Sequence, residues 1–326
     1  MSHASPSSRP PAELFRALAL LAEPPGASHG AAAAALGLPA VPGAEEHTEV
    51  FVLQCHPYAS VHLGPEGMLG GEARDRVAGF WRALGLVPPA EPDHLGALLA
   101  LYAALCDARD GQVDPARRAS LDRAGQALLW EHLLPWAPVF LLKVAEAGSA
   151  FHRAWADLAL DALLVVGESV FRPAPLPLAL RDAGPPLDPA EGGPALLTAL
   201  LAPIRSGAIL TRADLARGAR EAGLGLRIGE RRFVLGAMLE QDAAATLRWL
   251  SGEVSRWAER HRSLAAVLEA VPGFWERRAR STAAILAAAA PKADRDPAFV
   301  DPAFVAVPGS GVGTRPDAAG FRGWGA

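Results

Sequence analysis

Apolar residues recur along this chain at intervals of three and four, the spacing that places them on one face of an α-helix. Four segments show the pattern most clearly: Leu14, Leu18 and Leu21; Val77, Phe80, Trp81 and Leu84; Leu95, Leu98, Tyr102 and Leu105; Phe151, Trp155 and Leu158. Alanine and leucine supply much of the 51% hydrophobic content, whereas strand-favouring isoleucine and tyrosine are scarce. We therefore predict an all-α protein whose short connections imply an antiparallel helical bundle.

Prolines and glycines set the boundaries of these predicted helices. In the first half we expect helices over 12–22, over 51–63 with a break at Pro57, over 71–84, from Pro92 onward, over 119–134, and from about Ser149. Pro92 suits the first turn of a helix, where a missing N–H does no harm. In the second half we expect helices over 194–201, 212–221, 231–241 and 244–268.

The distribution of prolines and glycines also divides the chain into five parts. Seven prolines fall within 171–194, which predicts a linker or a long surface loop. We expect an N-terminal segment over 1–44 that is partly disordered and a helical core over 45–170. Beyond the linker we expect a C-terminal helical region over 195–290 and a disordered tail over 291–326.

Charge is distributed unevenly, although the net charge is only −4. Residues 45–170 hold 17 acidic and 9 basic side chains, whereas 171–290 hold 16 basic and 12 acidic ones. The acidic first part favours a cationic partner and disfavours nucleic acid. Two distant cysteines predict no disulfide framework, and no stretch approaches the roughly 20 apolar residues of a membrane span. We expect a cytoplasmic protein without stable membrane insertion.

An enzymatic alternative rests on histidines and one carboxylate. Cys55, His56 and His62 are possible metal ligands, but the two histidines are six residues apart, which is wrong for one helical face. Asp93 and His94 are adjacent, so on a helix their side chains would point about 100° apart and could not act as a base and its orienter. A helical metal-dependent enzyme using His56, His62, Asp93 and His94 is the runner-up hypothesis. Our first expectation includes no catalytic residue, metal or cofactor.

A second alternative is a DNA-binding regulator that acts through residues 211–239. Thr211 could cap a first helix, and arginines stand at positions 212, 217, 220, 227, 231 and 232. The connection between the two predicted helices, which includes 223–229, is longer than the usual turn of a helix-turn-helix. An arginine-studded helical pair that packs on the bundle is the structural interpretation that we prefer.

Two short motifs carry most of the functional information. Glu91-Pro92-Asp93-His94-Leu95 is followed about forty residues later by His132-Leu-Leu-Pro-Trp136. They stand in order with Tyr58-Ala-Ser-Val-His-Leu-Gly-Pro and with the helix that ends Phe80-Trp81-Arg-Ala-Leu-Gly. In content and order this set resembles the TorD/DmsD/NarJ family of chaperones, over about residues 48–170.

The resemblance implies an all-helical, non-enzymatic chaperone that binds an apo-molybdoenzyme subunit, often through a twin-arginine signal peptide, until the molybdopterin cofactor is loaded. It implicates the acid-proline-acid-histidine region in peptide binding. With the tryptophans that could line a groove, the expected client-binding residues are Tyr58, Trp81, Glu91, Pro92, Asp93, His94, Leu95, His132 and Trp136. We expect Asp93 and His94 to border an accessible, acidic cleft. The proline-rich segment after 171 and the helices beyond it have no clear place in the family pattern.

Overall fold

The computed structural model describes residues 10–188, 193–268 and 270–295, and within them the prediction of an all-α fold is confirmed. The regular elements of this part of the chain are helices, apart from one isolated antiparallel bridge between Tyr58 and His94. No single described helix is long and apolar enough to cross a membrane, and one bent pair, Pro115–Leu133 with Ala137–Ala147, passes that test by length and composition only.

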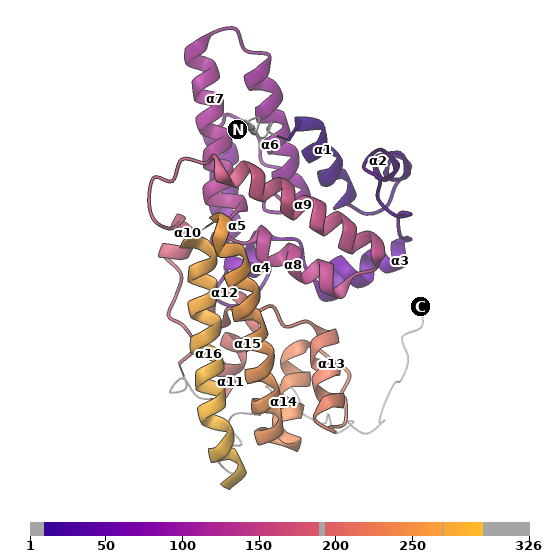
Figure 1. Cartoon of the computed structure of the whole chain (residues 1–326), viewed down its shortest axis with the longest axis vertical. Coiled ribbons are helices and arrows are strands. Elements are labelled where there is room, and N and C mark those ends of the chain that lie inside the picture. Colours follow the sequence, from indigo (N-terminus) through magenta and orange to yellow (C-terminus); the bar gives the residue numbers. More distant parts are fainter. Residues whose placement is uncertain (1–9, 189–192, 269, 296–326) are drawn as a thin grey trace, which may run out of the picture.

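The first half of the chain forms the upper bundle in Figure 1. Its elements are α1 (Ala12–Leu21), α2 (His29–Ala35), α3 (Ala44–His47), the π-helical turn η1 (Thr48–Gln54), α4 (Ala59–Leu63), α5 (Gly71–Ala83), α6 (Leu95–Asp110), α7 (Pro115–Ala127), the π-helical turn η2 (Leu128–Leu133), α8 (Ala137–Ala147) and α9 (Ala150–Glu168). Helix α1 packs on α6 through buried Phe15 and Leu18, and Trp155 of α9 donates a hydrogen bond to the Leu18 carbonyl. The N-terminal segment therefore contributes a helix to the core.

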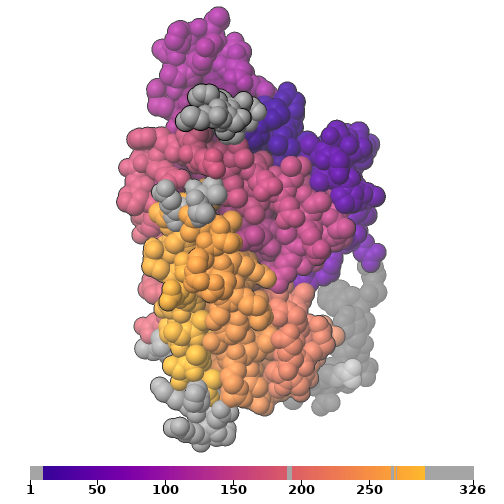
Figure 2. Space-filling view, viewed as in Figure 1, coloured from indigo at the N-terminus to yellow at the C-terminus, as the bar shows by residue number. Residues whose placement is uncertain are grey.

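The second half forms a smaller helical layer against the first (Figures 1 and 2). Its elements are α10 (Leu178–Arg181), α11 (Gly193–Leu201), α12 (Pro203–Ser206), α13 (Arg212–Glu221), α14 (Arg231–Gln241), α15 (Ala243–Leu268) and α16 (Ala270–Arg295). Helices α15 and α16 lie along each other, and α15 also contacts α9 of the first half. Trp275 of α16 donates a hydrogen bond to the Pro135 carbonyl at 2.9 Å, so the apolar core continues across both halves.

The expected helix from Pro92 is wrong at its start, because α6 begins three residues later. The backbone around Asp93 pairs with a neighbouring segment instead of coiling: the Ala59 N–H donates to the Asp93 carbonyl at 3.0 Å, and the Leu95 N–H donates to the Pro57 carbonyl at 2.8 Å. His94 then serves as the N-cap of α6. The break expected at Pro57 in the helix over 51–63 is confirmed, since η1 ends at Gln54 and α4 begins at Ala59.

The proline-rich segment over 171–194 is attached to the fold where it is described. It contains the short helix α10, and the side chains of Ala179, Leu180 and Leu187 are buried. The C-terminal helical region extends past its expected end, since α16 continues to Arg295. The disorder expected for residues 1–9 and for the tail from 296 onward concerns positions outside the described residues.

A buried set of charges joins the two halves. Lys143 of α8, which is 1% exposed, lies 2.7 Å from an Asp214 carboxylate oxygen on α13 and 2.9 Å from Glu146. Arg260 of α15 donates to Glu146 at 2.7 Å, and Arg217 lies 3.1 Å from Asp214. Burial opposes ionisation of Glu146, but the hydrogen bond from Arg260 and the charge of Lys143 outweigh it and lower the pKa of Glu146 to about 2.

Candidate functional site

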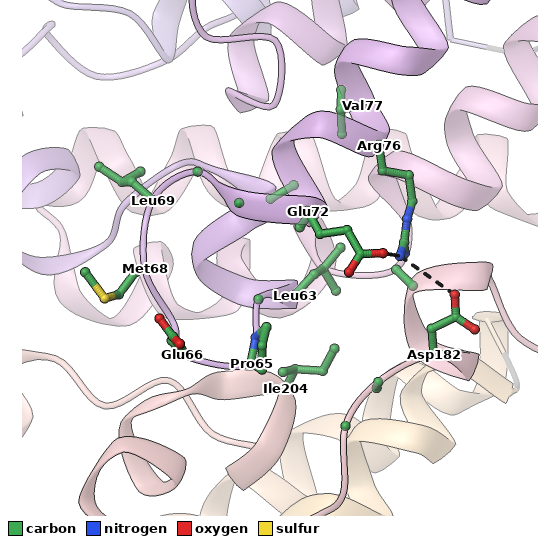
Figure 3. A pocket seen from close by; sticks show the side chains of 18 of the residues that line it. Leu63, Pro65, Glu66, Met68, Leu69, Glu72, Arg76, Val77, Asp182 and Ile204 are labelled. Carbon is green, nitrogen blue, oxygen red and sulfur yellow. Dashed lines mark hydrogen bonds and ion pairs between the residues drawn. The ribbon is translucent and has the colours of Figure 1, made fainter. Parts of the chain in front are cut away.

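A groove of about 520 Å³ lies where the two halves meet (Figure 3). One wall comes from α4, the loop that follows it, α5 and η2. The other comes from α10, the residues after it and Ile204 of α12. The first-half wall includes Ala59, Leu63, Glu66, Met68, Leu69, Glu72, Arg76, Val77, Glu131 and His132, and the second-half wall includes Ala179, Asp182, Ala183, Gly184 and Ile204. Both the helical core over 45–170 and the residues after it therefore contribute to the groove.

The loop over 64–70 brings exposed apolar side chains to this groove. Met68 and Leu69 are 66% and 61% exposed, so two adjacent large apolar side chains face solvent at this groove. The loop is fixed to α4 by a hydrogen bond from the Gly70 N–H to the Ser60 hydroxyl at 3.2 Å. It turns at Gly67, whose φ of +64° lies in the left-handed region. A Cβ atom at position 67 would lie 3.1 Å from the Leu201 carbonyl oxygen, so glycine permits the close approach of the loop to α11.

Acidic side chains outnumber basic ones around the groove. Arg76 forms ion pairs with Glu72 and Asp182 (Figure 3), at distances of 3.1 Å and 3.7 Å. Glu131 accepts a hydrogen bond from the Leu178 N–H at 2.7 Å. Glu66 forms neither an ion pair nor a side-chain hydrogen bond within the described residues. The groove thus offers an unpaired carboxylate beside exposed apolar surface, a combination that suits a cationic and apolar ligand.

His132 is the one residue of the expected client-binding set that lines the groove. It is 7% exposed, and its ring centroid lies 4.7 Å from that of Phe80. Burial, assisted by the charge of Arg76, lowers its pKa to about 4, so the imidazole is neutral near pH 7. A neutral imidazole can donate or accept a hydrogen bond at the groove wall without adding charge.

This histidine also makes stability depend on pH. Its folded-state pKa lies below 6.5, so its contribution is present above pH 6.5 and is lost as pH falls toward 4. We expect the free energy of unfolding to fall by up to about 1.4 kcal/mol per pH unit for each such histidine over that range. Urea unfolding at a series of pH values should show a shallower fall for His132→Gln than for the native chain. An unchanged slope would contradict this assignment.

The Asp93 side chain has a structural role next to the groove. It is 2% exposed, and its Oδ2 accepts a hydrogen bond from the Ser60 N–H at 3.0 Å, in the first turn of α4. The Ala59 N–H is satisfied by the Asp93 main-chain carbonyl. Since these N–H groups would otherwise have no partner at the start of a helix, Asp93 fixes α4, whose Ala59 and Leu63 line the groove.

His94 fastens α6 and α1 in a similar way. Its Nδ1 accepts a hydrogen bond from the Gly96 N–H at 3.1 Å and lies 3.1 Å from a carboxylate oxygen of Glu23. Gly96 has no room for a side chain, because a Cβ atom there would lie 3.0 Å from the Ala19 carbonyl oxygen. The acid-proline-acid-histidine motif is therefore a junction of α1, α4 and α6.

The expectation of an accessible cleft beside Asp93 and His94 is wrong for this conformation. The side chains of Pro92, Asp93, His94, Leu95, His132 and Trp136 are buried, because they cap helices or fill the core. Glu91 is exposed, and Tyr58 and Trp81 are partly exposed. The Tyr58 hydroxyl donates to Glu91 at 2.8 Å, and the Trp81 indole N–H donates to the Pro92 carbonyl at 3.3 Å. These three residues form the outer surface of the junction.

Sequence reasoning did not find the groove residues Glu66, Met68 and Leu69. They stand in a loop with several glycines and a proline, between the helices expected over 51–63 and 71–84. The available signal was the pair Met68-Leu69, because two large apolar residues in an otherwise turn-forming segment are either buried or available to a partner. Asp182 was equally hidden, since nothing in the sequence predicts that the proline-rich segment folds back onto α5.

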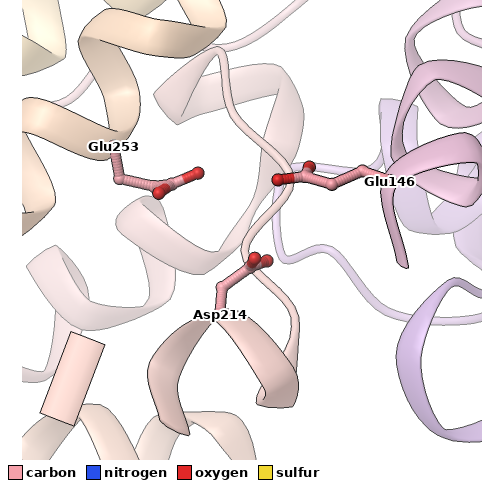
Figure 4. A group of neighbouring side chains, drawn as sticks. All are labelled: Glu146, Asp214 and Glu253. Carbon is pink, nitrogen blue, oxygen red and sulfur yellow. The ribbon is translucent and has the colours of Figure 1, made fainter. Parts of the chain in front are cut away.

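The residues of the metal-enzyme alternative are not gathered into a site. His62 is buried, stacks on Trp136 and binds the His56 carbonyl through Nε2 at 3.0 Å, whereas Asp93 and His94 cap separate helices. Within the described residues, the one group of three carboxylate, thiol or imidazole side chains with metal-compatible spacing is Glu146, Asp214 and Glu253 (Figure 4). Lys143, Arg217 and Arg260 already pair with those carboxylates, which explains the cluster without a metal ion.

The described residues form an all-helical protein with an acidic, partly apolar furrow between its two halves. A family model described as "Nitrate reductase delta subunit" matches residues 31–141, from α2 into α8. Residues 31–141 are thus similar to the NarJ/TorD-type family of molybdoenzyme chaperones. A search of curated proteins found no match to the chain. The match confirms the family resemblance and leaves the extension from α9 onward outside it.

Proposed function

We propose that this protein is a maturation chaperone that binds an apo-molybdoenzyme subunit and releases it after cofactor insertion, and that a segment of the client occupies the groove. The match of residues 31–141 to a chaperone family supports the general role. The groove supports the location, because it is walled by family residues on one side and has apolar and acidic groups within reach of a bound chain. Binding and release need no catalytic side chain and no cofactor resident in the protein.

The groove chemistry favours an extended client segment that carries arginine beside apolar residues. A guanidinium group can form a charge-assisted, two-pronged hydrogen bond with a carboxylate such as Glu66. Met68 can adapt its flexible thioether to apolar side chains of different shapes. A twin-arginine signal peptide, with paired arginines followed by an apolar run, has this composition. We propose such a leader as the client segment, with binding in the cytoplasm before export.

The buried residues of the motif at 91–95 do not line the groove, and we propose that they support it through α4. Asp93 holds the first turn of α4, and α4 supplies Ala59 and Leu63 to the groove wall. Ser60 of the same helix accepts the hydrogen bond that seats the Met68–Gly70 loop. In this proposal, Pro92, Asp93, His94 and Leu95 contribute to client binding by positioning α4 and its loop, whereas Tyr58, Trp81 and Glu91 offer a second contact surface on the outside.

The proposal predicts that a synthetic twin-arginine peptide binds the full chain and that Glu66→Lys weakens the binding. The substitution places a cation where the peptide's guanidinium would lie. Loss of one charge-assisted hydrogen bond, about 1.5–3 kcal/mol, corresponds to a rise in Kd of about 10- to 150-fold. Isothermal titration calorimetry at low and high salt measures it. A peptide with both arginines replaced by glutamine should bind the native chain as weakly.

Asp157→Lys is the matched control, because Asp157 is exposed on α9 and does not line the groove. It makes the same change in net charge and should leave the Kd unchanged within error. Equal weakening by the two variants would indicate a general charge effect. Undiminished affinity of Glu66→Lys would remove the groove from the proposal, and failure of the native chain to bind any client segment would remove the chaperone role.

A further inference from the structure

A second surface, which the groove does not use, combines unpaired arginines with exposed apolar side chains. We call it the arginine-rich face and define it by Arg212, Leu226, Arg227, Ile228, Arg232 and Phe233. These residues lie in the first turns of α13 and α14 and in the connection between the helices. Ile228 is 96% exposed, Leu226 49% and Phe233 41%. Surface exposure of three large apolar side chains within eight consecutive residues indicates a surface for interaction.

Hydrogen bonds bring the parts of this face together. Arg231 donates to the Leu210 carbonyl at 2.9 Å, which ties the start of α14 to the start of α13. The Ala213 N–H donates to the Gln54 side chain at 3.0 Å, which ties α13 to η1. A Cβ atom at Gly229 would lie 2.7 Å from the Phe233 ring, so the ring sits against the residue after Ile228. Val52 and Leu53, which precede Gln54 in η1, are exposed as well.

The charge of the face is positive and uncompensated. Arg212 and Arg227 are exposed and Arg232 is partly exposed, and none of them has a salt bridge or side-chain hydrogen bond within the described residues. Glu230 is the one acidic residue between Arg227 and Arg232. By contrast, Arg217 on the same helical pair is held by Asp214 and Glu253. The lowered pKa of Arg231, caused by burial and then by the charge of Arg212, agrees with a local excess of positive charge.

An anionic lipid surface matches both properties of the face. Basic residues are attracted to anionic headgroups, and isolated apolar side chains between them can enter the headgroup region. Nucleic acid would use the arginines but would leave Ile228 and Leu226 facing a polar backbone. The connection between α13 and α14 is also too long for a helix-turn-helix motif. Nine residues separate the two helices, whereas that motif has a turn of about three or four.

We infer that the arginine-rich face binds the surface of anionic membranes reversibly, without any segment that spans the bilayer. This goes beyond the proposed chaperone function and does not depend on what the groove holds. It would place the groove near a membrane surface while a client is bound. Attachment through a few basic and apolar side chains is weak, which allows the protein to leave the surface.

The test is sedimentation of the full chain with vesicles of phosphatidylglycerol and phosphatidylcholine, compared with vesicles of phosphatidylcholine alone. We expect binding to the anionic vesicles only, and less binding as the salt concentration rises. Arg227→Gln and Arg232→Gln should each lower the partition coefficient about fivefold, from about 1 kcal/mol for each basic residue at such a surface. Ile228→Asp should lower it further, because it replaces the most exposed apolar side chain with an anion.

Arg82→Gln and Val87→Asp are matched controls, since both residues are exposed and lie outside the face. They should bind anionic vesicles as the native chain does, and circular dichroism should show the same helix content in every variant. Equal binding of neutral vesicles, or native binding by the Arg227, Arg232 and Ile228 variants, would overturn the inference. So would binding of duplex DNA by the native chain in place of vesicles, which would assign the face to nucleic acid.

Discussion

Replacement of Lys143 by methionine should lower the free energy of unfolding by about 1.5–3 kcal/mol, because it removes a buried cation that donates to two carboxylates and leaves Asp214 with Arg217 and Glu146 with Arg260. Lys143 is 1% exposed, and Asp214 beside it is also buried. Methionine fills a similar volume, so the loss would report the missing charge and not a cavity. Chemical denaturation followed by circular dichroism measures the effect.

Arg16→Ala provides the contrast. Arg16 and Asp107 form an ion pair between α1 and α6, but both side chains are about half exposed. Such pairs contribute less than about 1 kcal/mol, so the variant should unfold nearly as the native chain does. If Lys143→Met and Arg16→Ala were equally mild, the charges between α8, α13 and α15 would not hold the two halves together.

The variant Asp93→Arg should also be destabilised by about 3–5 kcal/mol, because it places an unpaired charge at a buried position. It also leaves the Ser60 N–H at the start of α4 without its acceptor. We expect weak client binding by this variant to follow from the loss of α4, with the transition in urea shifted to lower concentration. Hydrogen exchange at Ser60 and its neighbours should accelerate.

Glu91→Arg is the matched control for Asp93→Arg, because it makes the same change of charge at an exposed position. Glu91 is exposed two residues earlier in the same motif, and its side chain accepts a hydrogen bond from the Tyr58 hydroxyl. The reversal of charge is identical, yet the free energy of unfolding should change by less than about 1 kcal/mol. Native stability of Asp93→Arg would mean that the side chain at position 93 can reach solvent, and that the motif contacts clients directly.

Helical periodicity predicted most of the fold, because the spacing of buried residues is a local property. The expected helix over 212–221 coincides with α13, where Thr211 and Asp214 form a reciprocal cap that the sequence already displays. The prediction was wrong where a tertiary contact competes with the local one. Pro92 fits the first turn of a helix in isolation, but the backbone from Pro57 to Ala59 pairs with Asp93 and Leu95 and delays the start of α6.

The groove could not be derived from the sequence, because its walls come from three separate stretches of the chain, residues 59–77, 131–132 and 179–204. The motif at 91–95 drew attention to the correct region, since Asp93 supports α4, but motif residues proved to be buried supports. Sequence patterns do not separate a side chain that touches a ligand from one that holds the residue that does. That distinction depends on exposure, which is set by distant packing partners such as Trp136 and His62.

The position of Ala179–Gly184 on one side of the groove has an evolutionary consequence. This segment lies outside residues 31–141, which match the family, while the opposite wall lies within them. Mutations in the segment could change which partners are accepted without disturbing the shared scaffold. Related chains that differ there would then be expected to diverge in selectivity while keeping a common architecture, and exchange of this short stretch between paralogues would transfer the preference.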